Sequence, residues 1–151
     1  MAAQAPRSES NAAKLRLRLW LRLLKASKAV EIELRDRLRR EFDTTLPRFD
    51  VMAMLARKGE GLKMSELSDA LMVSNGNVTG IVDRLVAEGL VVRVSIAGDR
   101  RATLVRLTPK GEAAFTDMAA AHEGWIGELL GGLGDDDVRA AISILDKVRK
   151  T

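Results

Sequence analysis

The sequence contains no cysteine and a single histidine, His122. Without cysteine the chain can form no disulfide, no thiolate nucleophile and no cysteine-based redox sensor. One histidine without cysteine also excludes a Cys/His zinc site. Aromatic residues make up only 3% of the chain, so aliphatic packing between helices must build most of the core.

Long apolar runs are also missing. The first ten residues lack the apolar stretch of a secretory signal peptide. The leucine-rich stretch 15–24 contains Arg16, Arg18 and Arg22, which a bilayer core would not accommodate. No glycine-rich phosphate loop is present, and no nucleophile accompanies His122. We therefore expect a cytoplasmic protein that is not an enzyme and holds no metal or cofactor.

Basic residues are concentrated at the N-terminal end of the chain. The first 40 residues hold eleven Lys or Arg and four Asp or Glu, a net charge of +7. Because the whole chain has a formal net charge of +4, the remaining residues carry −3. A basic balance favours a polyanionic partner, although net charge bears on association and not on fold.

Hydrophobic periodicity predicts one domain over residues 12–151, preceded by a flexible tail at 1–11. Leu17, Leu21 and Leu24 recur at helical spacing in a segment without proline or glycine. Thr45 is placed to cap a second helix that has Pro47 in its first turn. The expected elements are helices at 12–42, 46–58, 64–71 and 74–88, strands at 90–94 and 103–107, and helices at 109–130 and 136–150.

Only two residues join the third and fourth predicted helices. Such a link is typical of a helix-turn-helix, whose second helix enters the major groove of DNA. With Val78, Val82 and Leu85 in the core, the other face presents groups that can bond to bases or phosphates. Gly76 and Gly80 lie on one side of this helix and indicate close approach to another surface. The alternative interpretation of the whole exposed side is an ordinary polar helix face. The predicted DNA-binding residues of this helix are Ser74, Asn75, Asn77, Thr79, Asp83 and Arg84.

The two predicted strands form a hairpin with a charged tip. Asp99, Arg100 and Arg101 lie in this tip, and arginine on a protruding loop suits insertion into a narrow, negative minor groove. A solvated turn is the alternative interpretation. Three helices followed by a hairpin predict a winged helix-turn-helix, which is a mainly α fold with a small β-hairpin wing (α+β).

Eight segments together resemble the MarR (multiple-antibiotic-resistance regulator) family, over about residues 12–150. They are LPRFDVM at 46–52, ELSDAL at 66–71, VS at 73–74, T at 79, VDRL at 82–85, EGLV at 88–91, DRR at 99–101 and VRLTPKG at 105–111. The resemblance implies a dimeric repressor of a palindromic operator, relieved by a small anionic or aromatic ligand.

Two positions depart from the family pattern. Gly80 stands where such proteins often carry a larger, frequently basic residue, and Lys63 stands where a capping Ser or Thr is common. The first departure means that base specificity cannot be transferred from the family to this chain.

The surplus of arginine and lysine on the first predicted helix has two interpretations. One is a solvated face that attracts DNA non-specifically. The other is a phosphate-binding site beside an apolar space. The segments VSNGNVTGIVDRLVAEGLV and RLWLRLL resemble the branch of the MarR family that responds to aromatic acyl-CoA thioesters such as hydroxycinnamoyl-CoA. The ligand-binding residues predicted on this second reading are Arg16, Trp20, Arg22, Arg35, Arg39, Phe49, Met52, His122 and Trp125.

The terminal helices, at about 12–41 and 110–150, have apolar faces too extensive for the DNA-binding core at about 45–108 to cover. Burial against a second copy is the commonest solution. A homodimer would place two recognition helices on an inverted repeat with half-sites about one helical turn apart. Two other classes remain open at this point, a non-specific architectural DNA-binding protein and a winged helix that binds another protein.

Overall fold

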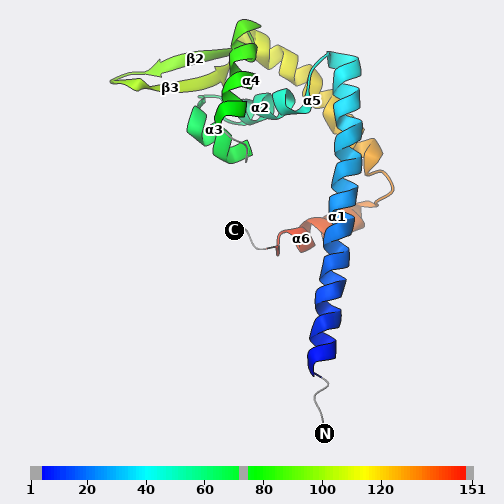
Figure 1. The fold of residues 1–151 in the computed structure, drawn as a ribbon. Helices are drawn as coiled ribbons and strands as arrows, with labels where there is room; N and C mark the ends of the chain where they lie inside the picture. The colour runs from blue at the N-terminus through cyan, green and yellow to red at the C-terminus, as the bar shows by residue number, and fades with distance from the viewer. Residues whose placement is uncertain (1–4, 72–74, 149–151) are drawn as a thin grey trace.

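The computed structural model describes residues 5–71 and 75–148 (Figure 1). These residues form a mainly helical fold with one small antiparallel sheet, which confirms the predicted fold class. The elements are α1 (Ala5–Phe42), α2 (Leu46–Arg57), β1 (Leu62–Lys63), α3 (Met64–Leu71), α4 (Asn75–Ala87), β2 (Val91–Ile96), β3 (Asp99–Leu107), α5 (Pro109–Leu129) and α6 (Asp135–Leu145).

Helix α1 is longer than the sequence pattern predicts. It begins at Ala5, so residues 5–11, predicted as part of a flexible tail, are helical. Pro6 lies in the first turn, where its missing N–H costs nothing, and no glycine follows to interrupt the helix. At the other end Asp43 adopts a left-handed conformation with a φ of 49°, which aspartate tolerates. The chain turns there into α2.

The sheet has three strands in the order β1-β3-β2, whereas the sequence predicted two. The short strand β1 pairs through Leu62 with Val105, and two residues are too few for a period-2 pattern. The hairpin is also longer than expected. Its turn is confined to Ala97 and Gly98, and Gly98 has the positive φ, +88°, that such tight turns require. Asp99, Arg100 and Arg101 therefore belong to β3 and not to a loop, which corrects the prediction.

The core lies between α2, α3, α4, α5, the sheet and the C-terminal half of α1. Val78, Val82 and Leu85 of α4 are fully buried, as their helical spacing predicts. On α2, Thr45 caps the first turn by accepting the Arg48 N–H at 3.3 Å. The buried apolar residues of this core are Leu34, Leu38, Leu46, Phe49, Val51, Met52, Leu55, Leu62, Leu67, Val78, Val82, Leu85, Val91, Val105, Leu107, Met118 and Trp125.

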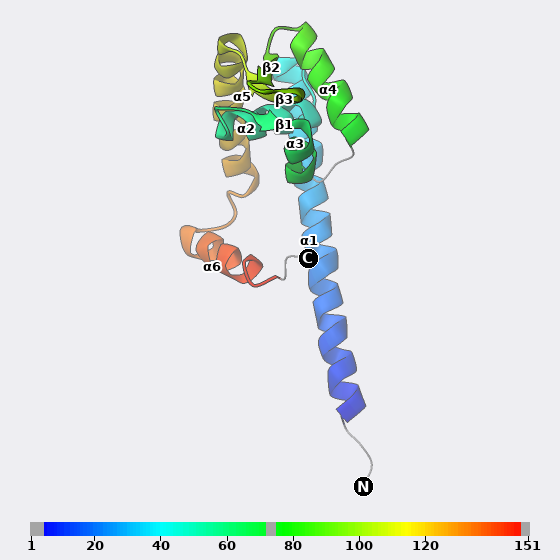
Figure 2. The same cartoon turned by 90° about the vertical axis from the view of Figure 1, so that its left-hand side faces the viewer.

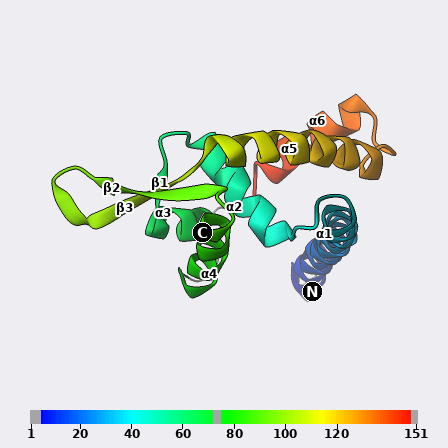
Figure 3. The same cartoon turned by 90° about the horizontal axis from the view of Figure 1, so that it is seen from above.

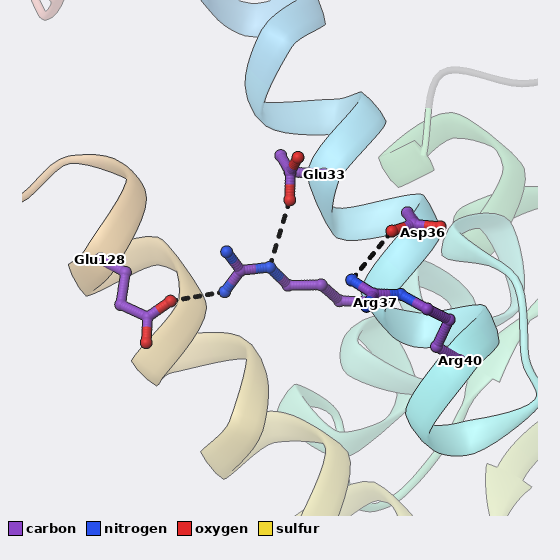
Figure 4. Close-up of polar contacts among 5 residues, drawn as sticks. All are labelled: Glu33, Asp36, Arg37, Arg40 and Glu128. Carbon is purple, nitrogen blue, oxygen red and sulfur yellow. Dashed lines mark hydrogen bonds and ion pairs between the residues drawn. The ribbon is translucent and has the colours of Figure 1, made fainter.

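One ion pair links the C-terminal half of α1 to α5 (Figure 4). The Arg37 side chain reaches from α1 to α5, where its Nη1 lies 2.6 Å from Oε2 of Glu128. Its Nε donates to Glu33 on the preceding turn of α1 at 3.3 Å. The hydrogen bond with Glu128 is the main reason why the pKa of Arg37 is raised. A second pair, Arg40 with Asp36 at 2.9 Å, lies entirely on α1.

The N-terminal half of α1 and helix α6 both extend away from the core (Figure 2). Trp20 on α1 is 55% exposed, and none of the residues of α6 is buried. Among the described residues, no helix is long and apolar enough to cross a membrane. The large exposed apolar residues of these two segments are Leu15, Leu17, Leu19, Trp20, Leu21, Ile142, Ile144 and Leu145.

Candidate nucleic-acid interface

Helices α3 and α4 form the predicted helix-turn-helix pair. Leu67 anchors α3 in the core, and the Ser68 hydroxyl donates to the carbonyl of Met64 at 3.0 Å. The predicted link, Met72 and Val73, and the predicted cap, Ser74, lie outside the described residues.

The face of α4 opposite its buried residues is exposed. Asn77, Thr79, Asp83 and Arg84 are exposed, as the sequence predicts, and Asn75 belongs to the first turn of the helix. A Cβ added at Gly80 would meet no atom within 4 Å, and the same holds for Gly76 on the turn before. These glycines are therefore not required by the protein's own packing, and the face is open to a partner.

Asp83 makes an ion pair with the wing. Its Oδ1 lies 2.5 Å from Nη2 of Arg93 on β2. This ion pair connects α4 to the hairpin. The prediction that Asp83 contacts DNA stays a prediction.

The β2–β3 hairpin projects away from the core on the side opposite to α1 (Figure 3). The register shifts between Ser95 and Ile96, so that Ser95 pairs with Thr103 and Ile96 with Asp99. This places the backbone of Arg100 in an irregular part of β3 near the tip. The hairpin is positioned as a wing beside α4.

The end of α4 is joined to the start of α5. Gly89 terminates α4 with a φ of +74°, and the Leu90 N–H donates to the carbonyl of Leu85 at 2.9 Å, closing the helix. The Thr108 hydroxyl donates to the Gly89 carbonyl at 2.6 Å and accepts the Gly111 N–H at 3.0 Å. These hydrogen bonds connect the end of the recognition helix to the first turn of α5.

A cavity of 660 Å³ lies between α2 and α4, and Arg35 of α1 contributes to its wall. Three arginines from three helices, Arg35, Arg48 and Arg84, line it together with one carboxylate, Asp50. Partial desolvation is the main reason why the pKa of Asp50 is raised; Glu31 raises it further, and Arg35 opposes both. The other residues of the wall are Thr45, Pro47, Val51, Leu71, Gly76, Asn77, Gly80 and Ile81.

The predicted ligand-binding residues are not gathered around one space. Arg35 lines the cavity, whereas Arg16, Trp20 and Arg22 are exposed on the N-terminal half of α1 and Arg39 is exposed near its end.

The remaining predicted ligand residues pack in or beside the core. Phe49 and Met52 are buried, and the Phe49 ring stacks on His122 with centroids 4.6 Å apart. Trp125 is buried and packs against Phe42 at a centroid distance of 6.1 Å.

Sequence reasoning missed Arg48, Asp50 and Glu88. Arg48 and Asp50 flank Phe49 in the sequence, and these charged residues beside an apolar one were the only available signal. This signal does not reveal that both residues line the cavity. Arg48 Nη2 forms an ion pair with Oε2 of Glu88, directly after α4, which is a contact between residues far apart in the sequence.

Comparisons with known proteins identify the family. The model for the MarR family matches residues 42–102. The chain is 37% identical to a MarR family transcriptional regulator from Silicibacter pomeroyi, covering 89% of this chain and 93% of that one with a TM-score of 0.76. It is 27% identical to a mutant of MarR from E. coli solved with operator DNA, covering 87% and 94% of the two chains with a TM-score of 0.77.

A curated relative agrees with these structures. The HTH-type transcriptional regulator MhqR of Bacillus subtilis is 28% identical over 100 residues, which are 66% of this chain and 68% of that protein. Because the relatives are regulators, the prediction that this chain is not an enzyme is confirmed. The predicted family is confirmed as well: the chain belongs to the MarR family of DNA-binding transcriptional regulators.

Proposed function

We propose that this regulator is a repressor that binds an inverted-repeat operator as a homodimer. The observation that carries the proposal is the outward face of α4, where Asn77, Thr79 and Arg84 are exposed beside two glycines that leave open space. Amide, hydroxyl and guanidinium groups are suited to base edges and phosphates. The E. coli relative was solved in complex with operator DNA, which supports operator binding by this chain.

Dimerisation is supported by the exposed apolar residues of α1 and α6. Trp20, Leu21 and Ile142 are each more than half exposed in the single chain, and large apolar patches of this kind mark interaction surfaces. Isologous pairing with a second copy is the commonest way to cover them. Two copies of α4 would then face successive major grooves, about one helical turn apart.

The cavity beside α4 is our candidate effector site. Its 660 Å³ falls within the range of about 300–1,000 Å³ that is usual for small-molecule sites. Arginine forks match carboxylate and phosphate oxygens. We propose an anionic aromatic effector, with an aromatic acyl-CoA thioester as the leading candidate, that lowers operator affinity by favouring a dimer shape that no longer fits the grooves.

Selection of binding sites from random duplex DNA by the purified protein tests this function. The expected outcome is an enriched inverted repeat with half-site centres about one helical turn apart. An enriched single half-site would contradict the dimer. DNA affinity without any enriched sequence would favour the architectural protein, and no DNA affinity at low salt would favour a protein-binding module.

A further inference from the structure

Glu88 is a carboxylate held among cations at the C-terminal end of the recognition helix. It directly follows Ala87, the last residue of α4. Nη2 of Arg48 contacts its Oε2, and Nζ of Lys110 donates to its backbone carbonyl at 3.0 Å. The hydrogen bond from Arg48 is the main reason why the pKa of Glu88 is lowered; desolvation opposes it, and the charges of Arg48, Lys110 and Arg84 add to it.

Arg48 belongs to two sites at once. It lines the cavity proposed for the effector, and it holds Glu88 at the end of α4. Its side chain is only 17% exposed, and its Nε donates to the Thr44 hydroxyl at 3.2 Å. The Arg48 guanidinium is therefore held in place, and it has limited room to bind Glu88 and a second anion at the same time.

We propose that Glu88 is a built-in competitor of the anionic effector. An oxyanion that enters the cavity takes the Arg48 guanidinium from Glu88, and the two negative charges repel each other. Glu88 then leaves its position, and the end of α4 loses its tie to α2. This inference rests on the proposed effector site and adds the element that transmits ligand binding to the recognition helix.

The other charges of the cavity favour this competition. Arg35 and Arg84 share its wall with Arg48 and attract an anion, and together the three arginines outnumber the one carboxylate, Asp50. Glu88 itself is 49% exposed, so water can solvate its carboxylate once Arg48 is lost. The cost of displacing it is correspondingly low.

The experiment compares the wild-type protein with Glu88→Gln and with Asp83→Asn as a matched control. Both substitutions remove a carboxylate that pairs with an arginine at α4, but only Glu88 pairs with a residue of the cavity. Calorimetry measures the Kd of hydroxycinnamoyl-CoA, with CoA and the free acid as further probes. Polarisation measures operator affinity with and without the thioester, and circular dichroism verifies that each variant is folded.

Glu88→Gln is expected to bind the thioester about two- to fivefold more tightly than the wild type, a range set by a partly exposed ion pair. Its operator affinity should be lower without ligand and should fall less when ligand is added. Asp83→Asn should bind the thioester with wild-type affinity. Equal thioester affinity in all three proteins, with operator release intact, would overturn this inference alone. Failure of all three to bind any probe would overturn the effector site and this inference together.

Discussion

His122 connects α5 to α2 through its stacked contact with Phe49. Burial lowers the pKa of His122 below the value of about 6.5 that it has in an unfolded chain. The unfolded state therefore takes up the proton first as the pH falls. Stability contributed by neutral His122 is fully present above pH 6.5 and is lost as the pH falls from there towards the folded-state pKa.

Replacement of His122 by Phe should remove this pH dependence and keep an aromatic ring against Phe49. The urea midpoint of the wild type should fall more between pH 7.5 and 5.5 than that of His122→Phe. Because the chain has one histidine, the difference between the two proteins reports this residue alone. Equal falls of the urea midpoint in the two proteins would show that protonation of His122 does not destabilise the fold.

Single residues of the outward face of α4 could be predicted from the sequence, because they follow from helical spacing around Val78, Val82 and Leu85. The partnership of Arg48 with Glu88 could not. It joins the start of α2 to the end of α4, and no local pattern specifies which distant carboxylate an arginine will meet. The same reason explains why the ion pair between Asp83 and Arg93 was not predicted.

At the scale of elements, the start of α5 packs closely on the end of α4. A Cβ added at Gly111 would lie 2.0 Å from the backbone carbonyl oxygen of Leu90. That oxygen also accepts the Thr108 N–H at 3.0 Å, so it cannot move without breaking the junction.

Gly111→Ala should therefore destabilise the fold by about 3 kcal/mol, which is typical of overpacking against a fixed backbone. Gly124→Ala on the same helix is the matched control, because its Cβ would meet no atom within 4 Å. The control should gain about 0.5–1 kcal/mol from helix propensity. Urea unfolding of both variants measures the difference, and a mild effect of Gly111→Ala would refute the close junction.

Helix positions follow closely from sequence, whereas the sheet does not. The bounds of α3 match the prediction at both ends, and Gly89 ends α4 as expected. β1 is recognisable only from its pairing with Val105. The extension of β3 to Asp99 was missed because charged residues beside a glycine are typical of a turn, and pairing with β2 overrides that local preference.

At the scale of the whole molecule, α3, α4 and the β2–β3 hairpin lie at one end, and the N-terminal half of α1 extends towards the other (Figure 1). The sequence predicted this division, because apolar faces on the terminal helices exceed what a small core can cover. It did not predict the cavity at the boundary, since Arg35, Arg48 and Arg84 come from three helices and meet only in the folded chain.

The central claim is that the outward face of α4 reads DNA sequence. The ratio of affinities for the selected inverted repeat and a scrambled duplex, measured at one salt concentration, tests it most directly. Asn77→Ala and Thr79→Ala should each lower this ratio at least about fivefold, since a good base contact discriminates by about 1–3 kcal/mol. Arg101→Ala should weaken both duplexes alike, as loss of a phosphate or minor-groove contact would. An unchanged ratio in both α4 variants would contradict the account.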